Sequence, residues 1–476
     1  MSTAENVELD FPTHDENEAD ALAGLRSQVT GAVLTASDEG YAAACAGFNV
    51  LVRHHPAVVV VAQETRDIAA AVRFAAEAGL RVAVQATGHG AARPADGALL
   101  IVTSQLTGVT IDAAAATADV SAGALWGHVL EPAQAHGLAP LMGSTTGVGA
   151  IGYTLGGGMG WLGRRFGLGS DSVVHFDLVT PDGGELRASD TENPEVFWAL
   201  KGGGGGSLGV VTGMRIRLFG VTTVYAGNLL YPAEQAGEII RRFREWAPGT
   251  PEELTSSVAM INFPPIEDVP EPLRGKSFTI VRGCWSGDLQ AGEEVMRHWR
   301  EWQSPIMDMF GPLPFAMADM ISQDPKDPMP SMVTTEWFET LADNAIDILV
   351  GATQPEPGKP PTLLLTELRH AGGAIGRGAV DAVNNRGRSG EFLLEMVGVP
   401  PFPEAGLWIE AHQRHTRAKL SPYVTGAAYL NFTEGTEKQE RTASAFSPAS
   451  AARIAAVKAQ LDPSGRFSHG FALPSA

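Results

Sequence analysis

The sequence has little cysteine, little positive charge and no long apolar run. Its 476 residues include two cysteines, Cys45 and Cys284. They are far apart and lack CxxC spacing, which indicates neither a disulfide framework nor a zinc site. We expect two buried, reduced thiols. No apolar stretch approaches the ~20 residues that span a bilayer.

Basic residues are outnumbered: 34 Lys and Arg face 54 Asp and Glu, a formal net charge of −20. This balance argues against nucleic acid or an anionic membrane as a partner, because both need a basic surface. The N-terminus is acidic and lacks the basic-then-apolar order of a signal peptide. We therefore expect residues 1–20 to form an acidic tail on a cytoplasmic protein.

Apolar residues and glycine are abundant. Apolar residues make up 44% of the chain and charged residues 18%, which indicates a globular protein. The length favours two domains. The chain has 55 glycines, with the densest runs at residues 143–169 and 202–209 and no fixed period. Such clusters indicate backbone that approaches another group closely.

A β-α-β unit opens the ordered part of the chain. Residues 57–63 predict a strand, Thr65 to Gly79 a helix, and 81–85 a second strand that leads into the loop Thr87–Gly90. Helices are also expected in 21–48, 126–136, 193–200 and 447–461, and strands in 99–103, 108–111, 118–121, 173–180, 185–188, 210–218 and 429–432.

The composition changes near residue 222: glycine becomes less frequent and prolines cluster. The pattern predicts helices at about 233–247, 288–303 and 336–350, and strands at about 277–285, 361–368 and 391–398. We predict a first domain over 21–221, an inserted second domain over 222–421, and a segment, 422–476, that returns to the first domain. The second domain is expected to be a sheet covered by helices.

One glycine motif allows a competing interpretation. Gly147–Gly152 matches G-x-G-x-x-G, and Asp171 follows 19 residues later, as in a nicotinamide-binding Rossmann unit. The preceding residues make a weak strand, and Gly156–Gly158 would break the following helix. A glycine loop that donates backbone N–H groups to a diphosphate needs no Rossmann fold.

Two further sites stand out from the residues alone. His89 lies between two glycines at a strand end and is suited to contact a cofactor; no second ligand at metal-binding spacing lies nearby, so we predict no metal. Tyr429 and Asn431 alternate with apolar residues and are expected on one face of a strand. Each of these residues also permits a purely structural role.

The order of these motifs resembles the FAD-linked oxidases of the vanillyl-alcohol-oxidase type, nearest the berberine-bridge-enzyme-like branch. The resemblance covers most of 45–221 and 423–470 and is weak between them. It is carried by Gly88-His89, Asp96-Gly97, Val120–Gly127, His136–Leu138, Gly152–Gly158, Asp190, Phe197–Thr212, Tyr429–Asn431, and Val457-Lys458 with Asp462-Pro463 and Phe467.

The resemblance implies an α+β fold: a two-subdomain, PCMH-type FAD-binding domain with an inserted substrate domain, an antiparallel sheet covered by helices. It implies FAD joined to His89 by an 8α-histidyl bond. Many relatives add a bond from a cysteine in the second glycine loop, but here no cysteine lies between Cys45 and Cys284, so a single attachment is expected. Gln85 and Gly90 replace a common arginine and serine. The implied cofactor-binding residues are Ala86, Thr87, Gly88, His89, Gly90, Ser144, Thr145, Gly147, Val148, Gly149, Gly152, Tyr153, Gly156, Gly157, Gly158, Val211, Tyr429 and Asn431.

The resemblance also frames the expected chemistry. Tyr429 is the first candidate base, followed by Glu395 and Glu367; Phe432 stands where relatives often carry a second tyrosine. A tyrosine base near neutral pH requires its pKa to fall well below the ~10 of a free phenol. Trp337, Phe392 and Trp408 are candidates for an aromatic pocket wall or for core packing.

We therefore expect an FAD-dependent oxidase that takes hydride from a C–H bond of a small alcohol, sugar, amine or natural-product intermediate and passes electrons to dioxygen. The alternatives are an NAD(P)-dependent dehydrogenase that uses Gly147–Gly152 and a flavin-binding protein without turnover. The resemblance alone suggests secondary metabolism. Substrate and oligomeric state are not determined by the sequence.

Overall fold

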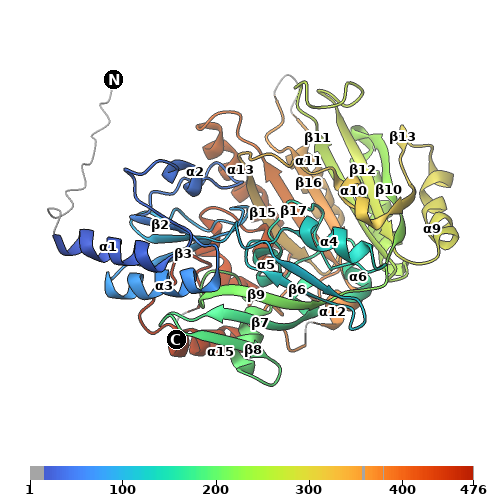
Figure 1. Ribbon diagram of the computed structural model, residues 1–476. Coiled ribbons are helices and arrows are strands. Elements are labelled where there is room, and N and C mark those ends of the chain that lie inside the picture. Colours follow the sequence, from blue (N-terminus) through green and yellow to red (C-terminus); the bar gives the residue numbers. More distant parts are fainter. Residues whose placement is uncertain (1–15, 356–359, 379, 475–476) are drawn as a thin grey trace, which may run out of the picture.

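The computed structural model describes residues 16–355, 360–378 and 380–474, which form three sheets and their flanking helices (Figure 1). Residues 1–15 of the expected acidic tail lie outside this range, and 16–20 begin the first helix. Over the described residues, no helix is both long enough and apolar enough to cross a membrane. Cys45 and Cys284 are buried and unpaired.

The helices are α1 (Glu16–Gln28), α2 (Tyr41–Cys45), α3 (Thr65–Glu77), α4 (Trp126–Gln134), α5 (Ala150–Leu155), α6 (Gly163–Phe166), α7 (Pro194–Leu200), α8 (Ala236–Trp246), α9 (Leu289–Trp302), α10 (Asp319–Ser322), α11 (Asp343–Thr353), α12 (Gly373–Arg377), α13 (Ala405–Leu420), α14 (Glu437–Glu440) and α15 (Pro448–Leu461).

The first sheet contains the predicted β-α-β unit. Its strands are β1 (Ala32–Leu34), β2 (Val58–Val61), β3 (Val82–Gln85) and β4 (Leu99–Val102), in the order β1-β2-β4-β3. β2 and β3 both run parallel to β4. α3 buries Ile68, Val72 and Ala75 against them and ends before Gly79, whose φ of 68° suits glycine. β3 therefore delivers the Thr87–Gly90 loop from a buried strand.

The second sheet is antiparallel and has the order β5-β6-β9-β7-β8. Its strands are β5 (Val109–Asp112), β6 (Thr117–Ser121), β7 (Val173–Val179), β8 (Glu185–Ser189) and β9 (Val210–Arg217). Ile454 and Val457 of α15 pack in the same core as Phe176 of β7. Phe467 packs in the core of the first sheet. The chain's last described segment thus lies on the first two sheets, while the domain boundaries stay predictions.

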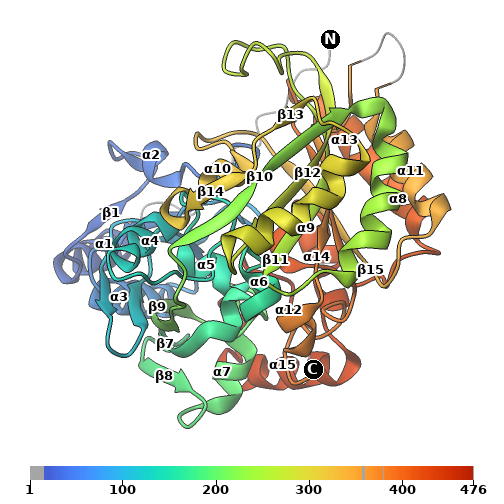
Figure 2. The same cartoon turned by 90° about the vertical axis from the view of Figure 1, so that its right-hand side faces the viewer.

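The third sheet is antiparallel and covered by helices, which confirms the expected architecture. Its strands are β10 (Thr223–Pro232), β11 (Leu254–Asn262), β12 (Ser277–Trp285), β13 (Met307–Asp308), β14 (Gly311–Pro314), β15 (Met332–Phe338), β16 (Leu365–His370) and β17 (Phe392–Gly398). The order is β13-β10-β12-β11-β16-β17-β15, with β14 also on β10. Side chains of α8, α9, α11 and α13 share one core with one sheet face, and Figure 2 shows α8 and α9 in front of the strands. The opposite face is left for a site.

Three predicted elements differ from the structure. The helix expected over 21–48 is replaced by α1 and α2 with β1 between them. The helix expected over 336–350 begins as β15, where β-branched Val333, Thr334 and Thr335 favour a strand; the helix is α11. The strand expected over 429–432 is absent, and Leu430–Phe432 form a 3₁₀ turn. There the carbonyl of Tyr429 accepts from the Phe432 amide at 3.0 Å, a local bond that replaces strand pairing.

Candidate functional site

A cavity of about 450 Å³ lies where the three sheets meet. Its size is typical of small-molecule and cofactor sites. The first sheet contributes Gln85, the second Val211, and the third Glu367, Arg369 and Glu395. The cavity thus lies between the part that resembles an FAD-binding domain and the face of the third sheet opposite the core of α8, α9, α11 and α13.

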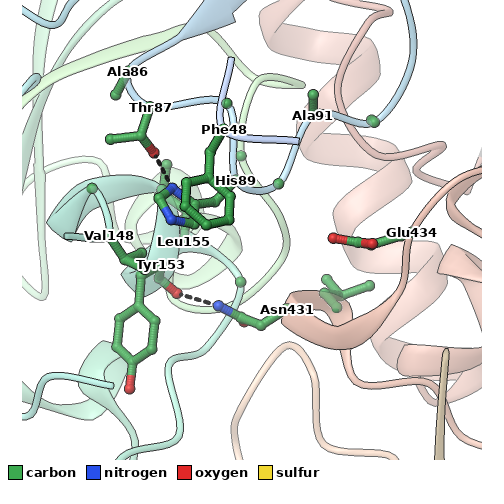
Figure 3. A pocket seen from close by; sticks show the side chains of 18 of the residues that line it. Phe48, Ala86, Thr87, His89, Ala91, Val148, Tyr153, Leu155, Asn431 and Glu434 are labelled. Carbon is green, nitrogen blue, oxygen red and sulfur yellow. Dashed lines mark hydrogen bonds between the residues drawn. The ribbon is translucent and has the colours of Figure 1, made fainter. Parts of the chain in front are cut away.

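The loop after β3 holds His89 at the cavity wall (Figure 3). Gly88 has a φ of 75°, and a Cβ there would lie 2.6 Å from the Cα of Gly47, so the loop needs glycine. The His89 ring stacks on Phe48 with centroids 3.7 Å apart, and its Nδ1 lies 2.8 Å from Thr87 Oγ1. Burial lowers the pKa of His89 to about 4. The imidazole is therefore neutral near pH 7, the form that acts as a nucleophile.

A buried lysine fixes the same loop from the opposite side. Lys438 is 1% exposed, and its ammonium donates to the carbonyl of Gly90 at 2.6 Å. Glu434, in the segment just before α14, accepts from the Val333 amide at 3.1 Å and from Ser331 Oγ at 3.3 Å. Burial lowers the pKa of Lys438 and raises that of Glu434, and each charge opposes the shift of the other. The pair links the His89 loop to β15.

The second glycine loop lies beside the first. Gly149 precedes α5, a helix of six residues, and no strand is assigned to the described residues 140–148 before it. A Rossmann unit needs a strand, the glycine loop and a full helix in succession. The nicotinamide interpretation of Gly147–Gly152 is therefore wrong.

Asn431 closes the cavity beneath this loop. Its Nδ2 donates to the carbonyl of Tyr153 at 3.0 Å (Figure 3). A Cβ on Gly156 would lie 2.3 Å from Asn431 Oδ1, so glycine allows the amide side chain to approach α5. This contact explains part of the glycine cluster by close packing.

A segment from the third-sheet region, residues 319–331, crosses the second glycine loop; we call it the strap. Asp319 accepts from the amide of Thr146 at 2.8 Å and from its hydroxyl at 2.6 Å. Asp324 accepts from Ser144 Oγ at 2.5 Å. At its far end, the Met329 amide donates to the carbonyl of Phe48 at 2.9 Å. The strap therefore connects both loops of the cavity.

Two carboxylates face each other on the third sheet. Glu367 and Glu395 are register partners on β16 and β17, and Arg369 donates to Glu367 at 2.9 Å and to Glu395 at 2.8 Å. Burial would raise the pKa of Glu367, but Arg369, Arg282 and a bond from Ser257 lower it. Burial raises the pKa of Glu395 to about 7; Arg369 opposes this rise and neighbouring carboxylates add to it. Glu395 is thus suited to exchange a proton near neutral pH.

Tyr429 does not show the low pKa that a tyrosine base requires. Its hydroxyl accepts from the Met159 amide at 2.6 Å. Burial nevertheless raises the pKa of Tyr429 above the usual value. The phenol stays protonated at neutral pH and has its own proton to donate. The arrangement is that of a positioning group at the cavity wall.

Most residues proposed from the sequence do meet at this cavity. Those that line it are Ala86, Thr87, Gly88, His89, Gly90, Ser144, Thr145, Val148, Gly149, Gly152, Tyr153, Gly156, Val211, Glu367, Glu395, Tyr429 and Asn431. Three glycines do not: Gly147, Gly157 and Gly158. The carbonyls of Gly157 and Gly158 turn away and accept from the amides of Ser170 and Gly169.

The aromatic candidates are not cavity residues. Trp337 is buried and packs edge-on against Tyr429, with ring centroids 6.1 Å apart. Phe392 lies in the core under the helices, and Trp408 is 63% exposed on α13. Core packing accounts for the first two residues.

Several cavity residues were missed in the sequence. They are Phe48, His54, Arg93, Asp324, Arg369, Glu434, Lys438 and His469–Phe471. No helical spacing marks Glu434 and Lys438, because Glu434 precedes α14. Nothing in the local pattern of Phe48 or His469 distinguishes them. The run Gly204–Gly206, part of a glycine cluster expected to approach another group closely, does line the cavity.

Some cavity-lining side chains carry buried polar atoms without a partner among the described residues. These atoms are His54 Nε2, Gln85 Oε1, Arg93 Nε, Tyr153 Oη, Asn431 Oδ1 and both ring nitrogens of His469. A buried polar group without a partner is unfavourable by about 1–3 kcal/mol. Because these unpartnered atoms all line one cavity, a large polar ligand bound there would supply their missing hydrogen bonds.

Comparison with known proteins gives a consistent result. Residues 56–189 match the family model of an FAD binding domain. The (R)-6-hydroxynicotine oxidase of Paenarthrobacter nicotinovorans is 26% identical over 471 residues, covering 93% of this chain and 96% of the oxidase. In structure, a chitooligosaccharide oxidase has a TM-score of 0.79 at 20% identity, over 94% of this chain and 98% of the other. A berberine-bridge-enzyme-like protein of Physcomitrella patens has a TM-score of 0.80 at 18% identity, over 94% and 97%.

Proposed function

The chain belongs to the FAD-linked oxidoreductases of the vanillyl-alcohol-oxidase (PCMH-type) flavoprotein family, and we propose that it acts as an oxidase on a small alcohol or amine. The observation that carries the proposal is the placement of Glu395, with a pKa near 7, in the same cavity as the His89 loop. A proton acceptor and a cofactor-binding loop thus face a common space.

The residues present fit FAD. The cavity-lining parts of three loops, Thr87–Gly90, Ser144-Thr145 with Val148-Gly149, and Gly205-Gly206, offer backbone N–H groups of the kind that hold phosphates. The unpartnered polar atoms of Gln85, Arg93 and His469 suit the polar parts of a dinucleotide. These three loops and side chains would hold the cofactor.

FAD, when bound, supplies the electron acceptor: hydride leaves the substrate carbon, the adjacent O–H or N–H releases its proton, and dioxygen takes up two electrons and two protons to give hydrogen peroxide. Glu395 receives the substrate proton, and Arg369 holds the Glu395 carboxylate in place at 2.8 Å. Tyr429 orients the substrate by a hydrogen bond. The apolar side chains that line the cavity exclude water from the reacting carbon.

We further propose that FAD is attached through His89 alone. The neutral, buried imidazole supplies the nucleophile, and Phe48 and Lys438 fix its loop. The position of Ser144 in the second loop offers no thiolate for another bond.

Acid precipitation tests this proposal. Yellow colour should stay in the pellet of wild-type protein and move to the supernatant for His89→Ala. His55→Ala, an exposed histidine, is the matched control and should keep the colour in the pellet. Peroxide release over a panel of alcohols and amines then tests turnover. A yellow protein that releases no peroxide with any of them would instead be a flavin-binding protein without turnover.

A further inference from the structure

The cavity face of the third sheet is organised in rows set by strand register. Glu367 on β16 pairs with Glu395 on β17, which forms a carboxylate row. Two residues along the strands, Leu365 pairs with Val397, and Val397 pairs with Val333 on β15. Two residues correspond to about 7 Å along a strand. An apolar row therefore runs beside the carboxylate row on the same face.

The apolar row is open to the cavity. Leu365, Val397 and Val333 all line it, and all three are half-buried, whereas their neighbours Thr366, Met396 and Thr334 on the opposite face are buried. Their uncovered surface is thus turned toward the space that a substrate enters. Burying that surface against an apolar group is favourable.

The carboxylate row leaves a hydrogen-bond acceptor for the substrate. Oε2 of Glu395 accepts from Arg369, and no bond among the described residues uses Oε1. Both oxygens of Glu367 already accept hydrogen bonds, from Ser257 and Arg369. A substrate that donates a hydrogen bond fits Oε1 of Glu395. A substrate carboxylate would be repelled by the ionised carboxylates of Glu367 and Glu395, since the Nε and Nη2 donors of Arg369 already bond these two residues.

We propose that the substrate is a compact alcohol or amine with an apolar substituent on its reacting carbon. The O–H or N–H lies at Glu395, and the substituent lies over Leu365, Val397 and Val333. Sugars and carboxylated alcohols are poor ligands, because their extra polar groups would be buried against the apolar row without partners. The inference rests on the proposed function, since it takes Glu395 as the proton acceptor.

Anaerobic titration of the FAD-loaded protein tests the substrate class. The probes are 1-phenylethanol, N-methylbenzylamine, mandelate, glucose and xylobiose; mandelate is 1-phenylethanol with a carboxylate in place of the methyl group. The first two should change the flavin absorbance with half-saturation at least tenfold below that of the other three. Equal or tighter binding of mandelate or a sugar, or no response to either apolar probe, overturns the inference.

Variants of the apolar row locate the effect. Leu365→Gln should raise the half-saturation concentration of 1-phenylethanol about tenfold. Leu407→Gln, at a position 70% exposed on α13, is the matched control and should leave it unchanged. Val397→Thr keeps the side-chain volume and gives a second test if Leu365→Gln does not fold. Unchanged half-saturation in the folded row variants contradicts the proposed placement.

Failure of this inference and failure of the proposed function give different results. A flavin whose absorbance shifts with the apolar probes but is never reduced supports the substrate class and refutes the oxidase. A flavin that is reduced by sugars or mandelate in preference to the apolar probes supports the oxidase and refutes the substrate class.

Discussion

At the level of single residues, Glu367 and Glu395 carry different protonation states although they face each other across two strands. Arg282, Arg369 and Ser257 surround Glu367, so its pKa is lowered. Burial raises the pKa of Glu395; of these partners only Arg369 opposes the rise, and neighbouring carboxylates, Glu367 among them, add to it. Pairs whose environments separate their pKa values in this way indicate the assignment of acid and base.

Glu395→Gln should lower kcat about 10²- to 10⁴-fold, the usual contribution of a positioned base. In the wild type, kcat/KM should rise with pH through about 7 as Glu395 loses its proton. The glutamine variant should lose this dependence. The measurement is peroxide release between pH 5 and 9, with Glu404→Gln, an exposed carboxylate, as the control. A wild-type profile retained by Glu395→Gln would assign the base elsewhere.

The same shift affects stability in the opposite direction. A carboxyl whose pKa is raised on folding binds its proton more tightly in the folded state. Its contribution to the free energy of unfolding is present below the ordinary value of 4.5 and is lost as pH rises through about 7. The group that needs to be ionised for turnover is therefore one that folding prefers protonated.

Residue types could be predicted from the sequence more readily than their environments. His89 and Asn431 were identified from their place in motifs, and both line the cavity. The sequence ranked Tyr429 above Glu395 as the candidate base. It could not indicate the raised pKa of Tyr429, which depends on burial and on a bond to Met159, 270 residues away. Long-range contacts of this kind leave no periodic signal.

At the level of elements, the strap holds the second glycine loop by side chains rather than by strand pairing. Asp319 accepts both donors of Thr146, and Asp324 accepts from Ser144. An acidic side chain that receives two bonds is a strong local constraint. The strap therefore fixes a loop that forms one wall of the cavity.

Asp319→Ala should lower the free energy of unfolding by about 1–3 kcal/mol, since it leaves the Thr146 amide and hydroxyl without their acceptor. It should also lower the fraction of protein that carries flavin after purification. Asp327→Ala, an exposed position on the same strap, is the control. The measurements are thermal unfolding and the ratio of flavin to protein absorbance. Equal values for the two variants would contradict a role of the strap in shaping the loop.

Elements with a strong local signal were predicted well. β2, α3 and β3 follow from a β-branched run, a helical apolar period and a terminal glycine. β10 and β11 were not predicted, and β15 was taken for helix. β10 and β11 lie between neighbouring strands and are buried along most of their length, and β15 is an edge strand buried at Thr334–Phe338; in all three, sheet pairing and burial rather than local alternation determine the structure.

At the level of the whole molecule, one cavity joins parts of the chain that are distant in sequence. Its lining comes from all three sheets, from the strap and from His469–Phe471 near the C-terminal end of the described residues. The α+β class and the helix-covered antiparallel sheet were predicted by family resemblance, and the structure confirms both. The convergence of the three sheets, the strap and the C-terminal segment on one cavity could not be predicted, because it depends on how the whole chain folds.

A cavity formed only in the folded chain predicts how FAD affects stability. A ligand that binds the folded state alone stabilises it by RT ln(1 + [L]/Kd), about 1.4 kcal/mol for each tenfold rise in free ligand above Kd. In His89→Ala, which can hold FAD only reversibly, the unfolding temperature should therefore rise as free FAD is raised over a hundredfold range. In the wild type, FAD attached through His89 already fills the cavity, so added FAD should leave the unfolding temperature unchanged. Scanning calorimetry of both proteins makes the comparison. A wild type that responds to FAD as His89→Ala does would show that its cofactor is not attached.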